Sequence, residues 1–354
     1  MTRRPRPRRR AVPRKAPPGP LRMVAGVAVA FAAFLIVAGA WVTWTYRGPG
    51  PQAPRGAATT VVLERGSGLS EIAGELAQAG VIKSKALFMA AARLTGAAGV
   101  LKAGEYEFRS GASMARVLDD IRAGRVVRHL ITVPEGWTSE MAWEAVQRQP
   151  VLTGQAPVPA EGALLPDTYQ VQRGDSRAAV LQRMADAQDK LMAELWPKRQ
   201  PGLPFDTPEK ALTLASIVEK ETGIAAERPR IAAVFVNRLR QGMRLESDPT
   251  IIYGISRGRP LGRGILASEL AAATPYNTYR IDGLPPTPIA NPGRASIEAV
   301  LNPPRSTELF FVADGSGGHV FASTFDEHQR NVAQWRRVER ERAARTAAGP
   351  GTGR

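Results

Sequence analysis

The sequence of 354 residues has no cysteine, three histidines and few aromatic residues, which make up 6% of the chain. Without cysteine the chain has no disulfide, no thiolate-bound metal and no cysteine nucleophile. The histidines, His129, His319 and His328, do not have the spacing typical of metal ligands. We therefore expect neither a metal nor a cofactor.

Acidic residues are missing from the first 22 positions, where nine of the basic residues lie. This Arg- and Pro-rich segment has little apolar surface to bury, and we expect it to be a disordered basic tail. The net charge of the chain is +16, and 16 minus 9 leaves +7 for the remainder. The remainder has no basic block interleaved with aromatic residues. We therefore expect no nucleic-acid partner, whereas an anionic glycan suits the charge.

Charges of either sign are missing from residues 23–46, MVAGVAVAFAAFLIVAGAWVTWTY. The run is long enough to cross a hydrocarbon core of about 30 Å, which takes about 20 residues. The basic flank predicts a single-pass helix with its N-terminus in the cytoplasm and with Trp41, Trp44 and Tyr46 at the outer interface. The alternative is a cleaved signal peptide, because residues 38–40 have the small-x-small form of a cleavage site.

Gly and Pro are frequent in residues 47–58, which predicts a linker. The next segment predicts a strand, two helices and a second strand. This β-α-α-β order resembles a LysM-like module, a small glycan-binding fold, and a plain spacer domain is the alternative. The four elements are expected at residues 59–63, 68–79, 84–95 and 104–108, within a module and connecting region over residues 59–135.

The rest of the chain mixes helices and strands, so the predicted fold class is α+β. Residues 244–294 are a loop-rich stretch dense in Pro, Gly, Asn and Tyr, of the kind that often carries function. We expect a second domain over residues 136–335 and a disordered tail over residues 336–354. Further helices are expected at residues 114–123, 139–148 with Ser139 as its cap, 176–195, 229–240 and 296–301, and strands at residues 128–133, 308–313 and 319–323.

One stretch, TPEKALTLASIVEKETG at residues 207–223, predicts a buried helix that ends in carboxylates. Asp206 or Thr207 can cap its start, and Gly223 suits its end. At about 100° per residue, Glu219 lies on the apolar arc of this helix. A carboxyl group there, near the negative end of the helix, is expected to have a raised pKa and to suit a general acid. The alternative is a structural ion pair between Glu219 and an arginine.

Seven motifs occur in a fixed order along the chain: VPEGWT (133–138), EGALLPDTY (161–169), LASIVEKETG (214–223), FVNRL (235–239), SDPTIIYG (247–254), TPYNTYRIDGLPPTPIANPGRASIEAVLNP (274–303) and GGHVFASTFDEH (317–328). With these motifs, residues 61–335 resemble the YceG-like family of endolytic murein transglycosylases. The topology is also similar, with one N-terminal span, a LysM-like region and a catalytic domain, here residues 136–335. Glu246 departs from the family pattern, in which glutamine is expected before SDPT.

The resemblance implies a membrane-anchored lytic transglycosylase. Such an enzyme cleaves the β-1,4 bond between N-acetylmuramic acid and N-acetylglucosamine within peptidoglycan strands, leaves 1,6-anhydro-N-acetylmuramic acid ends and would terminate nascent strand elongation. By position, the family's catalytic glutamate is assigned to Glu219. The resemblance also implies partners among penicillin-binding proteins or other wall-synthesis factors. The location it implies is the bacterial cytoplasmic (inner) membrane, with the catalytic domain in the periplasm.

The reaction needs only one catalytic carboxyl group, because the attacking hydroxyl belongs to the substrate. Glu221 lies about 200° around the helix from Glu219, so we expect that both cannot face one bond. Asp248 is either a turn residue or helix cap, or it positions the sugar. The tyrosine and asparagine candidates given below either bind the sugar or only pack the loops. Ser216 either contacts the substrate side or bonds to the helix backbone. The candidate substrate-binding residues are Ser216, Asp248, Tyr253, Asn277, Tyr279 and Asn291.

Two other functions fit the same sequence. A non-catalytic glycan-binding scaffold would recruit wall-synthesis enzymes and would not depend on Glu219. A two-carboxylate muramidase would use a second carboxyl group, from Glu221, Glu246 or Asp248, and would add water to the product.

Overall fold

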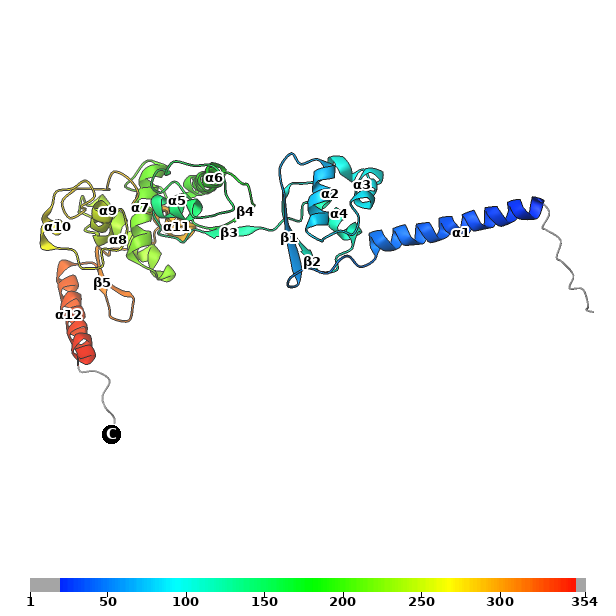
Figure 1. The fold of residues 1–354 in the computed structure, drawn as a ribbon. Helices are drawn as coiled ribbons and strands as arrows, with labels where there is room; N and C mark the ends of the chain where they lie inside the picture. Colours follow the sequence, from blue (N-terminus) through cyan, green and yellow to red (C-terminus); the bar gives the residue numbers. More distant parts are fainter. Residues whose placement is uncertain (1–19, 348–354) are drawn as a thin grey trace, which may run out of the picture. The chain divides into compact units, whose positions relative to one another are not determined.

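The computed structural model describes residues 20–347, which fall into two compact units that divide between Val127 and Arg128 (Figure 1). Residues 1–19 of the predicted basic tail and residues 348–354 of the predicted C-terminal tail lie outside the described residues. The predicted domain limits stay predictions. The observed division assigns residues 128–135 to the second unit.

The N-terminal helix α1 (Pro20–Arg47) contains the apolar run. Its part Met23–Arg47 contains an 18-residue stretch with a mean hydropathy of 2.5 that is not buried by other described residues. At 1.5 Å per residue this part is about 37 Å long, enough to cross a membrane. This is one N-terminal apolar helix of the kind that serves as a membrane anchor or as a signal sequence.

The first unit has the predicted order of strand, helix, helix and strand. Strand β1 (Ala58–Leu63) pairs antiparallel with β2 (Gly104–Arg109), so that Val61 lies opposite Tyr106. Val61 and Leu63 of β1 and Tyr106 and Phe108 of β2 are buried in the core, and the rings of Tyr106 and Phe108 stack at 5.8 Å. The strands and helices enclose one apolar core. The helices are α2 (Leu69–Gln78), α3 (Lys85–Leu94), the 3₁₀ turn η1 (Ala97–Gly99) and α4 (Met114–Ala123).

The segment predicted as a linker, residues 47–58, is bonded to the first unit. The amide of Gly50 donates to the carbonyl of Gly111 at 3.0 Å, and that of Gly111 donates to the carbonyl of Pro51 at 2.9 Å. The amide of Ala53 donates to the hydroxyl of Ser110 at 2.9 Å. Part of this segment therefore runs along the unit instead of forming a free tether.

The second unit also mixes helices with short two-stranded sheets, which confirms the predicted α+β class. Its elements are β3 (His129–Thr132), α5 (Ser139–Gln147), β4 (Thr168–Val171), α6 (Arg177–Leu195), η2 (Trp196–Lys198), α7 (Pro208–Glu221), η3 (Ala225–Glu227), α8 (Arg228–Arg240), α9 (Asp248–Ser256), α10 (Ala267–Ala271), α11 (Arg294–Leu301), β5 (Phe310–Ala313), β6 (His319–Ala322) and α12 (Phe325–Ala347). Antiparallel pairs form between β3 and β4 and between β5 and β6.

Helix α7 lies in the main core of the second unit. Thr207 caps it as expected, with its hydroxyl accepting from the amide of Lys210, and Pro208 occupies the first helical turn. Helices α8, α9 and α11 pack against it. The packing buries nearly every residue from Ala211 to Glu219, so α7 is covered on more than the single arc that the sequence predicted.

The structure corrects several local predictions. Thr138, and not Ser139, accepts the capping bond of α5. Helix α7 ends at Glu221 with Thr222 as its C-cap, before Gly223. Two short helices, α9 and α10, lie in the stretch predicted as loop, and β4 was not predicted. Residues 336–347, predicted as part of a disordered tail, continue α12.

Replacing the cap of α7 tests how far this helix stabilises the second unit. We expect Thr207→Ala to lower the free energy of unfolding by about 1 kcal/mol, because the amide of Lys210 loses its partner. Denaturant unfolding, followed for the second unit, measures the change. Ser84→Ala removes the matching cap of α3 in the first unit and should leave that transition unchanged. The prediction would be contradicted if Thr207→Ala and Ser84→Ala had equal effects on the unfolding of the second unit.

Candidate active site

The C-terminal end of α7 carries two carboxyl groups, Glu219 and Glu221. They lie two residues apart, and the helix turns about 200° between them. Each therefore contacts a different part of the second unit, as the sequence predicted. Their surroundings decide which of them can exchange a proton.

Glu219 is held in an ion pair. Its side chain is 3% exposed, and its Oε1 accepts from Nη2 of Arg228 at 2.9 Å. Its Oε2 accepts from the amide of Gly293 at 2.9 Å. Arg228 also pairs with Glu135 at 3.0 Å, and a side chain at position 293 would collide with that carboxyl group. The structural ion pair considered as the alternative for Glu219 is therefore present.

Glu221 lies in a different environment, against the start of α9. Its Oε1 accepts from the hydroxyl of Ser247. Burial raises the pKa of Glu221 to about 7; the bond from Ser247 opposes this shift, the charge of Asp248 adds to it and the charge of Arg238 opposes it. A carboxyl group with a pKa near neutrality is suited to give a proton and take it back.

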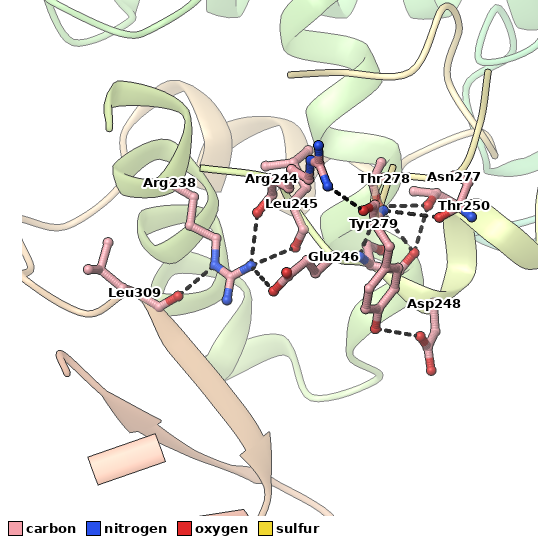
Figure 2. Close-up of polar contacts among 11 residues, drawn as sticks. Arg238, Arg244, Leu245, Glu246, Asp248, Thr250, Asn277, Thr278, Tyr279 and Leu309 are labelled. Atoms are coloured by element: carbon pink, nitrogen blue, oxygen red, sulfur yellow. Dashed lines mark hydrogen bonds and ion pairs between the residues drawn. The ribbon is translucent and has the colours of Figure 1, made fainter. Parts of the chain in front are cut away.

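Two of the predicted residues, Asp248 and Tyr279, lie together (Figure 2). The hydroxyl of Tyr279 donates to Oδ1 of Asp248 at 2.8 Å. Asp248 is exposed in the first turn of α9. Burial, followed by the bond to Asp248, raises the pKa of Tyr279 above its ordinary value, so its hydroxyl stays protonated. The Glu221 carboxyl contributes to that same shift, which places the three groups in one electrostatic cluster.

The backbone that carries this cluster is fixed by a second set of bonds. The amide of Ser247 donates to the hydroxyl of Thr278 at 2.9 Å. That hydroxyl also lies 2.9 Å from the hydroxyl of Thr250 (Figure 2). These bonds join the start of α9 to the loop that carries Tyr279, so Ser247 and Tyr279 are positioned by the same buried contacts.

Arg238, on α8, explains the unexpected residue at position 246. Its side chain is buried, and its Nη1 lies 2.9 Å from Oε2 of Glu246. A glutamine at this position would not carry the negative charge that balances the buried guanidinium. Glu246 has a left-handed backbone, with φ of 55°, that directs the chain into α9. The other acceptors for Arg238 are the carbonyl oxygens of Leu309 at 2.7 Å, Arg244 at 2.9 Å and Leu245 at 3.2 Å (Figure 2).

Two predicted substrate contacts, Ser216 and Asn291, are fully buried. The hydroxyl of Ser216 donates to the carbonyl of Thr213 at 2.7 Å and accepts from the amide of Ile289 at 2.9 Å. Asn291 donates to the carbonyl of Trp137 at 3.0 Å. Its side-chain oxygen accepts from the amide of Leu164 at 3.0 Å and from the hydroxyl of Ser139 at 3.2 Å. Both side chains hold loops onto the core.

Tyr253 and Asn277 are also used within the protein. The hydroxyl of Tyr253 donates to Glu161 at 3.1 Å, and its ring packs on that of Tyr276 at 5.0 Å. Asn277 accepts from the amide of Tyr279 at 3.0 Å. It also donates to three carbonyl oxygens, those of Glu269, Leu270 and Ala272. Of the six candidate substrate-binding residues, Asp248 and Tyr279 are the two that lie in the cluster with Glu221.

The described residues contain no group of three or more His, Asp or Glu side chains placed to hold a metal ion. Sequence reasoning also missed Arg228 as the partner of Glu219. Its position nine residues later, beyond the turn after α7, gave no helical spacing from which the contact could be inferred.

The ion pair of Glu219 can be tested through stability. Arg228→Met would leave a buried carboxylate without its main partner, and we expect a loss of about 3–5 kcal/mol in the free energy of unfolding. The double variant Arg228→Met, Glu219→Gln removes both charges and should recover part of that loss. Denaturant unfolding of both variants checks this. A double variant less stable than Arg228→Met would contradict a structural role for the pair.

Comparisons with known proteins place this chain in a family. The chain is 30% identical over 325 residues to proteins named endolytic murein transglycosylase from two strains of Streptococcus pneumoniae, D39 and R6. The match covers 78% of this chain but spans only 58% of the length of those relatives. A Bacillus subtilis 168 protein of the same name is 29% identical over 300 residues, covering 76% of this chain and 82% of the relative.

A crystal structure of a yceG-like protein from Listeria monocytogenes is 28% identical, covering 77% of this chain and 98% of that one, with a TM-score of 0.49. A TM-score of 0.49 is too low to infer a shared fold from the structures. The sequence model of the YceG-like family matches residues 61–334. The match includes α7 with both of its terminal carboxyl groups, and the chain belongs to the YceG-like family.

Proposed function

We propose that the protein is an endolytic murein transglycosylase that acts at the end of α7. Its relatives carry that name, and the family match covers both units beyond α1. The observation that carries the proposal is the half-buried Glu221 carboxyl, which accepts from the hydroxyl of Ser247 and interacts with the charge of Asp248 and with Tyr279.

The proposed reaction cleaves the β-1,4 bond between N-acetylmuramic acid and N-acetylglucosamine. The protonated carboxyl group gives its proton to the glycosidic oxygen, and the bond from that oxygen to C1 of the muramyl residue breaks. The resulting carboxylate takes the proton of the muramyl C6 hydroxyl, whose oxygen forms the new bond to C1. The products are a free N-acetylglucosamine hydroxyl and a 1,6-anhydro ring, and no water is consumed.

We propose that Glu221 carries this proton, in place of Glu219, to which the sequence assigned the role. Both oxygens of Glu219 are occupied, one by Arg228 and the other by the amide of Gly293. Glu221 has a pKa near neutrality, so a protonated fraction is present at the pH of the cell. Within one turn of helix, one carboxyl group stabilises the fold and the other is free to cycle a proton.

Asp248 and Tyr279 are the proposed contacts for the sugar nearest the cleaved bond. A tyrosine ring can pack on the face of a sugar ring, and a carboxylate can accept from sugar hydroxyls. Their mutual hydrogen bond orients both groups before a substrate arrives. In this proposal the four buried residues, Ser216, Tyr253, Asn277 and Asn291, support the site without touching the glycan.

A hydrolase is the second candidate function, because Asp248 supplies a second carboxyl group near Glu221. A pair of carboxylates at a suitable separation would activate water against the same bond. The two reactions differ by one water in the mass of the product, so mass spectrometry of products from purified glycan separates them.

We also propose that α1 anchors the enzyme in the cytoplasmic membrane, with the N-terminus inside and both units outside in the periplasm. The basic residues before α1 and the aromatic residues at its other end support this orientation. The β-α-α-β order of the first unit supports a LysM-like, glycan-binding role. Peptidoglycan strands are the proposed substrate, and penicillin-binding proteins or other wall-synthesis factors are the proposed partners in terminating strand growth.

Glutamine variants of the two carboxyl groups test the assignment. We expect Glu221→Gln to lower the rate of anhydro-end formation on the order of 10²–10⁴-fold, the usual size of a general acid–base contribution. Glu219→Gln is the matched control. It should lower stability through the loss of the Arg228 pair while retaining most of the rate per folded molecule, measured where circular dichroism shows the variant folded.

The assay uses glycan strands that lack stem peptides and, separately, crosslinked wall. A Glu221→Gln variant with near wild-type rate would overturn the assignment, and loss of rate in Glu219→Gln alone would return the role to Glu219. A non-catalytic scaffold predicts no anhydro ends from the wild-type chain. A muramidase predicts products that carry one additional water.

The pH dependence of the rate gives an independent test. Glu221 must be protonated to act as the acid, so kcat/KM should fall as the pH rises through about 7, the pKa of this group. Asp248 raises that pKa and Arg238 lowers it. Asp248→Asn should therefore move the midpoint of the fall to lower pH, whatever it does to the rate itself. An unchanged midpoint in that variant would show that another group is titrating.

A further inference from the structure

The outer end of α1 is joined closely to the first unit. Tyr46 packs against the apolar core of that unit. The amide of Gly48 donates to the carbonyl of Trp44 at 2.8 Å, so the helical bonding continues to the residue after α1. A side chain at Gly50 would collide with the carbonyl of Ala112. These contacts fix the end of α1 against the rest of the unit.

Helix α3 lies beside this end of α1. Val42 and Tyr46 from α1 line one cavity of about 470 Å³ together with Leu87 and Leu94 from α3. The two helices are also in contact elsewhere along this junction. The last turn of α3 is thereby placed alongside the part of α1 that carries Trp41 and Trp44.

The face of α3 at this junction is apolar and basic. Leu94 is 88% exposed, and Val100, just after α3, is also exposed. Arg93, next to Leu94, is exposed, and the helix sequence, KALFMAAARL, contains no acidic residue. Apolar side chains rimmed by basic ones are typical of helices that lie in the interface of a membrane with anionic lipids.

We propose that α3 lies on the outer surface of the lipid bilayer, with Leu94 inserted at the boundary between headgroups and acyl chains. The occupant of the α1–α3 cavity is then lipid. This rests on the proposed anchoring of α1, because the bilayer that surrounds α1 is continuous with the cavity and with Leu94. Trp41 and Trp44 set the depth of α1 in the bilayer, because tryptophan side chains prefer the membrane interface. Leu94 lies beside the same part of α1 and is therefore placed at the interface as well.

The contact would give the first unit a fixed orientation on the membrane. An anchor followed by a free tether would let the unit rotate and move away from the lipid. Here the fixed end of α1 and the insertion of Leu94 give two points of attachment, and Arg93, next to Leu94, can bind a lipid phosphate. The glycan-binding surface proposed for this unit would then be held at a constant height above the membrane.

The lack of cysteine allows single-site labelling of the full chain. Leu94→Cys, labelled with an environment-sensitive fluorophore, is reconstituted in nanodiscs of phosphatidylethanolamine and phosphatidylglycerol. We expect blue-shifted emission and strong quenching by lipids that carry a quencher on the upper part of the acyl chain. Trp41→Cys reports whether α1 is in the bilayer, and Val62→Cys, on β1 of the same unit and 42% exposed, is the solvent-facing control.

Quenching at position 94 close to that at position 41 and well above that at position 62 supports the proposal. Water-like emission at position 94, with quenching at position 41 only, overturns it and leaves the anchor intact. Lack of quenching at position 41 overturns the anchor and the lipid contact together. Mass spectrometry of the chain purified from cells shows in that case whether α1 was removed as a signal sequence.

Discussion

The ion pair between Glu219 and Arg228 constrains the whole second unit. It is almost fully buried, so loss of either partner would leave an unpaired buried charge and destabilise the unit. It connects the end of α7 to the start of α8, and the Gly293 amide adds the loop before α11. Three segments that are far apart in the chain are thereby brought to one point, and the last turn of α7 is held in place.

The consequence for chemistry lies on the other side of the same turn. Because Glu219 fixes the helix end, Glu221 is held against Ser247 without needing an ion pair of its own. Burial then raises its pKa toward neutrality, and Arg238 is kept from cancelling that shift because Glu246 balances part of its charge. The unexpected glutamate at position 246 fits this electrostatic arrangement better than a neutral residue would.

The loop stretch from Arg244 onward shows how a polar segment can be rigid. Asn277 and Asn291 supply buried amides that satisfy backbone groups of irregular chain, as β-sheet or helix bonds would do elsewhere. The hydrogen-bonding groups of these two side chains are therefore already used within the protein. Exposed groups such as Asp248 remain for a ligand, which separates the residues that build this site from those that can contact a glycan.

The sequence by itself determined much of this protein. Apolar runs and periodicity located α1, most of the helices and the β-α-α-β order, and the capping residue Thr207 located the start of α7, because these features depend on local propensity and burial. The motifs identified the family, and the helix end was recognised as the place of interest. Only the tertiary structure shows that the two carboxyl groups there have different partners. Arg228, Gly293 and Ser247 reach α7 from distant parts of the chain, and the charge state of a buried carboxyl depends on such neighbours and not on its position along a helix.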